Sequence, residues 1–321
     1  MAGIFCVSLD TEYFWGVHDT ATLEEYGKNV ENGRKNVIPG ILSLFDKYGI
    51  HATWAMVGAA MANNAEEMEK YMPDFKNQPS YINPIRNPYH LVNESKDNSF
   101  LSFILYAKSD IDRIKGTKGQ EIGTHTFSHY YCEEAGQTLE QFKADIQSAQ
   151  EIAKSNRLSI SSIVFPKGEY KRDNINIVRD SGIRIYRGLE DNWIYRVKLP
   201  NILKRGFRLM DAYIPISGHN CHKPVMEDGI LNLVGSRIFK PYNPTLSILE
   251  PLKIRRIKKQ MEYAAKHNLV FHLWWHPHNF GSYTDVNLQE LEEVLNNYKQ
   301  CNMKYGMKSM NMSEIMAQGD Y

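Results

Sequence analysis

The sequence has 321 residues, of which 42% are hydrophobic and 23% are charged, and this composition excludes a disordered or fibrous chain. The 38 Lys and Arg residues nearly balance the 37 Asp and Glu residues, for a formal net charge of +1, which argues against nucleic acid as a partner. The length allows one large domain or two ordinary ones.

The positions of the cysteines and of the apolar residues indicate the cellular compartment in which the protein is expected. The four cysteines, Cys6, Cys132, Cys221 and Cys301, are scattered, which predicts reduced thiols rather than a disulfide framework. The N-terminus lacks a basic segment followed by an apolar one, and no apolar run reaches the roughly 18 residues of a membrane span. We therefore expect a cytoplasmic protein with no integral membrane segment, and the oligomeric state stays open.

The first predicted elements form a strand–helix–strand unit. The apolar run 4–9 reads as a buried strand that ends in acidic residues. Apolar residues in helical spacing over 33–48 predict a helix that Gly49 ends. The apolar run 51–58 predicts a second buried strand, so the three elements imply a right-handed parallel unit.

Two irregular stretches interrupt the later alternation of strands and helices. Residues 59–118 and 189–251 are expected to be insertions on the rim of the domain. Around them we predict strands at 121–123, 161–166, 184–188 and 269–275, helices at 138–154, 173–181, 252–267 and 287–299, and a closing apolar segment at 307–315. This alternation predicts one α/β domain over 1–321, either a barrel or an open sheet, with function at the C-terminal ends of the strands.

Carboxylates stand at the end of the first predicted strand. Asp10 and Glu12 are two residues apart, so on an extended strand both side chains point the same way. One of them can hold a metal while the other serves as the base for a bound water. The alternative is a pair of solvated acidic residues at a strand end.

The segment "THTFSH" follows another predicted strand and contains His125 and His129. A helical turn of the backbone would place both rings on one face, in the geometry of paired metal ligands. Two ordinary surface histidines are the alternative. The carboxylates at the first strand end favour the metal site, because two imidazoles and one carboxylate leave positions open for water and substrate.

The segment "FHLWWHPHN" contains three further histidines. His276 lies at the strand exit, where an imidazole suits the protonation of a departing amine, and His278 is the second candidate for that acid. His272 is expected to be a satisfied buried residue. The histidines of "HNCH", residues 219–222, are not expected to form a metal site.

The order of these motifs resembles the polysaccharide deacetylases, the carbohydrate esterase family 4 with the NodB-homology domain. The resemblance lies in "VSLDTE", "LFDKYGIHATWAMVG", "GQEIGTHTFSH", "VFPKGEY", "YRGLEDNW" and "LVFHLWWHPHNF". The first motif and the "HPHN" ending are most similar to members linked to bacterial surface polysaccharides such as O-antigen.

The resemblance implies a distorted barrel of the (β/α)7 type that binds one divalent metal, usually zinc, through a carboxylate and two histidines. Carried over by position, Asp10 matches the catalytic base, His125 and His129 match the metal ligands, and His276 matches the general acid. Glu12 is the expected third ligand. The family usually has adjacent Asp–Asp, whereas a Thr intervenes here, so the choice between Asp10 and Glu12 as ligand stays open.

The third motif departs from the family pattern. The family commonly has an Arg two residues before the Pro, where this chain has Val164, so the usual Arg partner of the base is missing. Lys167 is a candidate for that charge and for substrate binding, with a simple surface position as the alternative. The peptide N–H groups of Gly168 and Glu169 are candidates for stabilising the oxyanion.

The fourth motif and the rim insertions supply the remaining candidates. Asp191 and Trp193 resemble the motif that orients and walls in the catalytic histidine, so Asp191 is grouped with the catalytic residues, and Trp193 with the substrate-binding ones, together with His278. Tyr81 and Tyr89 are candidates for stacking on a sugar, with simple packing as the alternative.

The function expected from these residues is metal-dependent hydrolysis of an N-acyl group, expected to be N-acetyl, on an amino sugar of a surface polysaccharide or its precursor. Metal and backbone N–H groups would hold the oxyanion, Asp10 would take the proton of water, and His276 would protonate the amine. One alternative is a deformylase or another amidase of the same fold that acts on a small amide. A second is a carbohydrate-binding protein that has lost catalysis.

Overall fold

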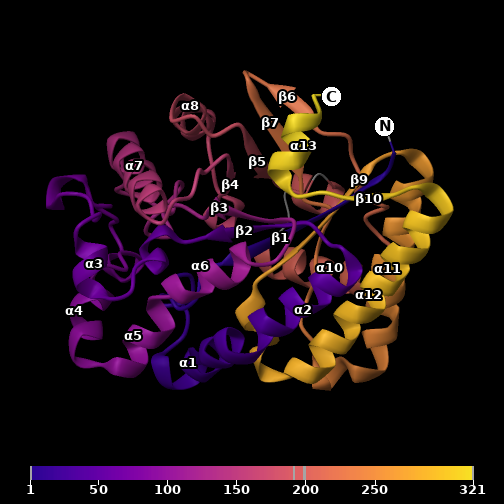
Figure 1. Ribbon diagram of the computed structural model, residues 1–321, viewed down its shortest axis with the longest axis horizontal. Coiled ribbons are helices and arrows are strands. Elements are labelled where there is room, and N and C mark those ends of the chain that lie inside the picture. Colours follow the sequence, from indigo (N-terminus) through magenta and orange to yellow (C-terminus); the bar gives the residue numbers. More distant parts are fainter. Residues whose placement is uncertain (1, 191, 198–199, 320–321) are drawn as a thin grey trace.

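The computed structural model describes residues 2–190, 192–197 and 200–319 (Figure 1). Its described strands are β1 Ile4–Thr11, β2 Ala52–Met56, β3 Gln120–Thr124, β4 Ser162–Val164, β5 Ile185–Gly188, β6 Val225–Glu227, β7 Ile230–Val234, β8 Arg237–Ile238, β9 Val270–Trp275 and β10 Lys308–Ser309. Its described α-helices are α1 Leu23–Asn32, α2 Ile38–Tyr48, α3 Ala65–Glu69, α4 His90–Asp97, α5 Ser99–Leu105, α6 Lys108–Lys115, α7 Leu139–Ser155, α8 Arg172–Asp180, α9 Trp193–Arg196, α10 Asn201–Tyr213, α11 Glu250–His267, α12 Thr284–Tyr305 and α13 Met312–Gln318.

The strands form one sheet in the order β6-β7-β5-β4-β3-β2-β1-β9-β8, with β10 beside β1. All strand pairs are parallel except β6 with β7. Each predicted strand from 4–9 to 269–275 is found. Parallel strands joined by helices confirm the predicted α/β class.

One bent strand, formed by β7 and β8, connects the β5 side of the sheet to the β9 side. Only Gly235 and Ser236 separate β7, which pairs with β5, from β8, which pairs with β9. The Gly235 N–H donates to the Gly188 carbonyl at 3.0 Å, and the Ser236 N–H donates to the His272 carbonyl at 2.9 Å. The segment therefore changes partner and links β5 to β9, which gives a distorted barrel of β1, β2, β3, β4, β5, β7/β8 and β9.

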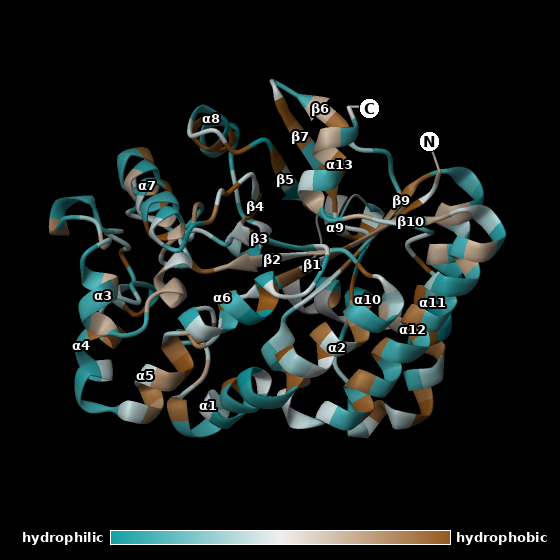
Figure 2. Cartoon of the chain, viewed as in Figure 1, coloured by the Kyte–Doolittle hydropathy of each residue, from teal (hydrophilic) through white to brown (hydrophobic). Residues whose placement is uncertain are grey.

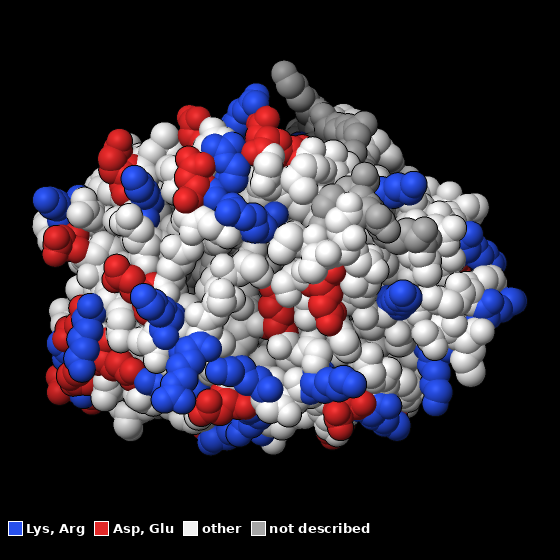
Figure 3. Space-filling view, turned by 45° about the horizontal axis from the view of Figure 1, so that its top comes forward, with Lys and Arg blue, Asp and Glu red and all other residues white. Residues whose placement is uncertain are grey.

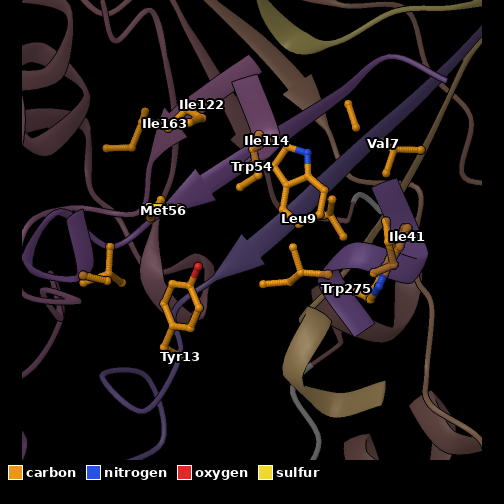
Figure 4. Close-up of a cluster of buried hydrophobic side chains, with 14 of the residues drawn as sticks. Val7, Leu9, Tyr13, Ile41, Trp54, Met56, Ile114, Ile122, Ile163 and Trp275 are labelled. Carbon is orange, nitrogen blue, oxygen red and sulfur yellow. The ribbon is translucent and has the colours of Figure 1, made fainter. Parts of the chain in front are cut away.

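Alternation along β1 separates the two sides of the barrel wall. Phe5, Val7 and Leu9 belong to the large core between the strands and the surrounding helices, and Figure 4 shows Val7 and Leu9 with helix residues such as Ile41. Ile4 and Cys6 belong to a smaller cluster with residues of β4, β5, β7 and β9. This is the period-2 pattern of a strand buried on both faces.

The inward-facing side chains change character along the barrel. The apolar cluster of Ile4 and Cys6 also includes Met312 and Ile315 of α13, and the Met312 N–H donates to Thr53 Oγ1 at 2.9 Å. Helix α13 therefore covers the end of the barrel where β1 begins, and Figure 1 shows it beside β5 and β10. Further along β1 come Ser8 and Asp10, so the polar groups gather at the C-terminal ends of the strands.

Local signals account for the helix boundaries. The Thr138 side chain accepts the backbone N–H of Gln141, and the Gln141 side chain accepts the backbone N–H of Thr138, so Thr138 caps α7 rather than starting it. Helix α12 extends beyond the predicted 287–299, to Tyr305, and ends at Gly306, whose φ of 69° suits a glycine C-cap.

The two predicted insertions contain more regular structure than their composition indicated. Residues 59–118 include α3 to α6, and residues 189–251 include α9, α10 and the bent strand β7/β8. The expectation that 189–251 is irregular is therefore wrong for the strand that completes the barrel. Its apolar runs are short and Gly235 interrupts them, so no strand-length pattern marks it.

The surface agrees with the near-zero net charge. Helices α4 and α11 carry many hydrophilic residues, whereas β7 and β9 are mainly hydrophobic (Figure 2). Acidic and basic side chains are interspersed over the face in Figure 3. Within the described ranges, no helix has the length and apolar character needed to cross a membrane.

Candidate active site

The two histidines of "THTFSH" lie in a loop after β3, and their ring centroids are 5.1 Å apart. The expected helical turn is wrong, because Thr126 and His129 have positive φ angles of 65° and 58°. The loop is held instead by hydrogen bonds: the Gly58 N–H donates to the Thr126 carbonyl at 2.8 Å, and the Tyr130 N–H donates to Thr126 Oγ1 at 2.7 Å. The rings converge through tertiary contacts rather than helical spacing.

A buried carboxylate on α7 completes the support of this loop. Asp145 is 1% exposed and accepts the N–H groups of Phe127, at 2.6 Å, and Ser128, at 3.0 Å, as well as the Ser128 hydroxyl. Burial raises the pKa of Asp145 to about 6, and the hydrogen bonds from Ser128 and Phe127 oppose that shift.

Glu12, His125 and His129 form the group that can hold a metal. Glu12 Oε2 lies 2.9 Å from His129 Nε2 and 3.5 Å from His125 Nε2, and ligand atoms of the three residues all lie within 4.8 Å of one another. All three side chains are buried. Of the two carboxylates left open by the sequence, it is Glu12 that lies with the histidine pair.

The hydrogen bonding of His125 tests whether this group suits a metal. His125 Nδ1 lies 2.8 Å from the Val164 carbonyl oxygen, and a carbonyl can only accept, so Nδ1 carries the proton. In the neutral ring that a metal requires, the lone pair is then on Nε2, which faces Glu12. A neutral imidazole oriented by a backbone carbonyl fits a metal ligand, so the described residues can bind a divalent ion.

Two more imidazoles surround Glu12. His276 Nε2 and His278 Nε2 each lie 3.6 Å from Glu12 Oε1. Burial by itself would raise the pKa of Glu12, but His276 and His129 hold that pKa well below its ordinary value. Burial lowers the pKa of His278 to about 4, so His278 is neutral near pH 7 and packs behind the carboxylate.

Asp10 has a partner that the motif comparison missed. Arg187, on β5, binds Asp10 through two hydrogen bonds, from Nη1 to Oδ1 at 2.6 Å and from Nη2 to Oδ2 at 2.7 Å. Arg187 also donates to Ser8 Oγ at 2.9 Å and lies 4.2 Å from the Trp274 ring centre. Burial would raise the pKa of Asp10, but Arg187 lowers it below its ordinary value, so the carboxylate is ionised near neutral pH.

The position of Arg187 explains the departure at Val164. The two residues are register partners on the adjacent parallel strands β4 and β5, so the arginine stands one strand away from the family position. The expectation that the Arg partner is missing is therefore wrong. Alternation in "RIYRG" places Arg187 on the same face as Ile185, and a buried arginine in a barrel strand needs a carboxylate; that signal was present in the sequence.

Lys167 does not replace this arginine. Its Nζ lies 3.7 Å from Asp19 Oδ2 and 3.7 Å from the Tyr131 ring centre. The idea that Lys167 supplies the charge beside Asp10 is wrong, because Arg187 occupies that place.

The turn after β4 changes the choice of oxyanion donor. The Gly168 N–H donates to the Phe165 carbonyl at 2.9 Å, and the Glu169 N–H donates to the Pro166 carbonyl at 3.1 Å. Both predicted donors are therefore used within the turn. Lys167 has a φ of 56°, and its N–H donates to no acceptor among the described residues.

His276 is the most accessible of the polar groups gathered here. Its Nε2 lies 3.7 Å from Asp10 Oδ2 and 3.6 Å from Glu12 Oε1, and its side chain is 22% exposed, whereas those of Asp10 and Glu12 are 4% and 6% exposed. A molecule that approaches from solvent can therefore contact His276 while the carboxylates remain enclosed.

The structure describes only part of the fourth motif, which contains Asp191 and Trp193. Asp191 lies outside the described residues. Trp193 is 42% exposed, donates from Nε1 to the Ile216 carbonyl at 2.8 Å and packs against Phe207. Among the described residues, the indole that contacts the His276 ring is that of Trp274, at 6.0 Å between centroids.

The remaining candidates are mostly structural. Tyr81 is 8% exposed and its hydroxyl accepts the Tyr131 N–H at 2.8 Å, while Tyr89 is equally buried; both pack rather than present a face. His272 is fully buried, as expected, and its Nε2 lies 2.8 Å from Ser8 Oγ. Its Nδ1 has no hydrogen-bond partner among the described residues, so the ring is satisfied on one side only. In the described parts of the chain, Glu12, His125 and His129 are the one group of three potential metal ligands, so 219–222 forms none.

Asp145→Asn is expected to weaken the affinity of this site for a divalent metal by about 10- to 100-fold, because the loop that carries His125 and His129 loses a charged acceptor. The measurement is competition for zinc with a chromophoric chelator. Glu140→Gln, at an exposed position on the same helix, is the matched control and should leave the affinity unchanged. Equal affinity in Asp145→Asn and the unmodified protein would contradict this role.

Comparison with known proteins agrees with the site. Residues 27–186, about half of the chain, match the family model described as polysaccharide deacetylase; this segment contains His125 and His129. No curated protein matches the chain.

Solved structures show the same fold. A protein assigned as a polysaccharide deacetylase from Mycobacterium smegmatis aligns with a TM-score of 0.57 and 12% identity, over 99% of this chain and 91% of that one. One from Pseudomonas aeruginosa PAO1 has a TM-score of 0.56 and 12% identity, over 98% and 90%. A GH57 branching enzyme from the hyperthermophilic archaeon Thermococcus kodakaraensis has 0.58 and 10%, over 100% and 72%.

These low identities show the fold alone, and the family match supplies the chemistry. Together with the matched segment, the distorted barrel and the buried carboxylate–histidine group identify a hydrolase that acts on amide bonds. The chain belongs to the polysaccharide deacetylase family.

Proposed function

We propose that the protein removes an N-acetyl group from an amino sugar in a metal-dependent hydrolysis. The observation that carries the proposal is the placement of His276 within 3.7 Å of two carboxylates with different surroundings. Asp10 is paired with Arg187, whereas Glu12 lies against His125 and His129. Because their surroundings differ, we assign Asp10 as the base, His276 as the acid, and Glu12 with the two histidines as the metal ligands.

Glu12, His125 and His129 would hold the metal, and zinc suits their nitrogen and oxygen donors. A divalent ion at this site supplies Lewis acidity toward the amide carbonyl and makes water more acidic. The chain's own residues do the rest. Asp10, kept ionised and oriented by Arg187, accepts the proton of the attacking water.

Two donors complete the proton and charge balance. The Lys167 N–H is available to donate to the oxygen that gains negative charge as the carbonyl is attacked. His276, the accessible imidazole, gives a proton to the nitrogen as the C–N bond breaks, so acetate and a free amine leave. Asp191 would orient this histidine, as the resemblance to the family implies.

The substrate proposed is an amino sugar of a bacterial surface polysaccharide, such as O-antigen, or its cytoplasmic precursor. The family match supports a carbohydrate substrate. Trp193, Lys167, Gly168, Glu169 and His278 were the expected substrate contacts. Trp193 and Lys167 keep partly exposed side chains, whereas His278 is 4% exposed, so we assign His278 to the support of Glu12.

The test combines metal analysis with product analysis. The purified protein should contain one divalent ion per chain by mass spectrometry of the elements, and it should release acetate from N-acetylated amino sugars. His125→Ala should lose both the ion and the activity, while His90→Ala, at an exposed position, should lose neither. A protein that binds no metal, and is unaffected by His125→Ala, would be a binding protein instead.

Formate release distinguishes the second candidate. A base without an arginine partner would favour a deformylase or another amidase over a deacetylase, but Arg187 supplies that charge beside Asp10. Release of formate from an N-formyl sugar, with no acetate from its N-acetyl counterpart, would nevertheless favour the deformylase.

A further inference from the structure

A cavity of about 310 Å³ lies next to the candidate active site. Trp274 forms part of its wall. The same indole contacts the Arg187 guanidinium, 4.2 Å from the ring centre, and the His276 ring, at 6.0 Å between centroids. The cavity is thus one side chain away from Asp10 and His276, and its volume is at the lower end of the range for small-molecule sites.

Basic side chains outnumber acidic ones around this cavity. Arg208, Arg237 and Lys240 line it, against Glu190 and Asp211. Asp211 is already neutralised, because its Oδ2 lies 2.8 Å from Arg237 Nη2 and its Oδ1 lies 2.8 Å from Arg256 Nη2. Among the described residues that line the cavity, three basic side chains therefore face two acidic ones.

The Lys240 ammonium carries the uncompensated charge. The Lys240 backbone carbonyl accepts a hydrogen bond from Lys253, but the Lys240 Nζ forms no ion pair or hydrogen bond with the other described residues. Burial lowers the pKa of Lys240, and the nearby Arg208 and Arg237 lower it further, while Glu190 opposes them. Burial first, and the two arginines after it, therefore disfavour the charged form of Lys240, and an anion in the cavity would offset this cost.

We propose that this cavity binds an anionic group, a phosphate or a carboxylate, that is covalently part of the amino-sugar substrate. Arg208 and Lys240 contact the anion, and the Trp274 indole lies between it and the N-acyl group held at Asp10 and His276. The inference rests on the proposed deacetylase function and makes it more specific. The substrate is an acidic or phosphorylated N-acyl sugar rather than a neutral polymer unit.

The probes are three sugars that differ in charge: N-acetylglucosamine, N-acetylglucosamine 1-phosphate and the corresponding uronic acid. Binding to the metal-loaded protein is measured by calorimetry. We expect at least one anionic probe to bind about tenfold or more tightly than the neutral sugar. The two anionic probes show whether the cavity takes phosphate or carboxylate.

Lys240→Met locates the binding. This substitution should lower the affinity for the anionic probe about tenfold and leave the affinity for the neutral sugar unchanged. Arg208→Gln should also lower the affinity for the anionic probe. Lys299→Met, which removes an exposed lysine from α12, is the control and should have no effect. Thermal unfolding confirms that each variant is folded. An anion held by the metal instead would keep its affinity in Lys240→Met, and that result overturns the proposal.

Acetate release, measured in parallel, separates the two hypotheses. A rise in KM for the anionic sugar in Lys240→Met, with kcat retained, supports both. If binding depends on Lys240 but no acetate is released, the result supports the anion site and contradicts the proposed deacetylase function. If neutral and anionic sugars bind equally and are turned over equally, the result supports the deacetylase function and contradicts the anion site.

Discussion

Asp10→Asn is expected to lower kcat for acetate release by about two to four orders of magnitude, because an amide cannot accept the proton of the attacking water. Asparagine has nearly the size of aspartate, and Glu12, not Asp10, lies with the two histidines. The metal content of the variant should therefore stay at the level of the unmodified protein. Initial rates and elemental analysis on the same preparation check both statements.

The matched control is Asp46→Asn, at an exposed position on α2, which should leave kcat unchanged. If the Asp10→Asn variant keeps its activity, another residue must be the base. One that loses its metal along with its activity would instead make Asp10 a ligand. The Asp10→Asn result therefore decides between the two carboxylates of "DTE".

Arg187→Met is expected to lower the free energy of unfolding by about 3–5 kcal/mol at neutral pH, because it leaves the Asp10 carboxylate buried without a counter-ion. Both side chains are less than 10% exposed in the pair, so water does not replace the lost guanidinium. Urea denaturation followed by circular dichroism measures the change. Arg184→Met, at an exposed position on the same segment, is the control and should change stability by less than about 0.5 kcal/mol.

A second substitution separates charge from packing. In the double variant Arg187→Met with Asp10→Asn, no buried charge is left unpaired, so much of the stability should return. If the double variant is as unstable as Arg187→Met alone, the loss comes from the contacts of Arg187 with Trp274 and Ser8 rather than from the ion pair.

The pH dependence of this difference follows from the pKa of Asp10. Arg187 lowers that pKa in the folded protein, so the pair contributes stability above the unfolded pKa of about 3.9 and loses it as the pH falls through the folded value. In Arg187→Met, burial without the arginine raises the pKa, so Asp10 takes up a proton as the pH falls. The stability gap between the two proteins should shrink from pH 7 towards pH 4.

Local pattern was enough for most of the barrel. The apolar run 4–9 and the helical spacing in 33–48 each act between residues close in the chain, so each can be recognised without the fold. The bent strand β7/β8 was missed for the opposite reason. Its two short halves are strands only because β5 and β9 pair with them.

The candidate site divides in the same way. Residue type and strand-end placement selected Asp10, Glu12, His125, His129 and His276, and these five side chains do gather at one end of the barrel. The site-residue roles themselves stay proposals. The fate of the Gly168 and Glu169 N–H groups could not be read from the sequence, because their use depends on the shape of one turn.

The sequence by itself determined the alternation of strands and helices outside the two insertions, the strand ends that carry polar groups, and the residue types of a candidate metal site, because these depend on periodicity and on intrinsic chemistry. Only the tertiary structure decided that Arg187 pairs with Asp10, that Glu12 joins the histidines, and that Lys240 borders a cavity behind Trp274. Those pairings join residues up to 177 positions apart, and distance in space between side chains on different strands is not encoded in any local spacing.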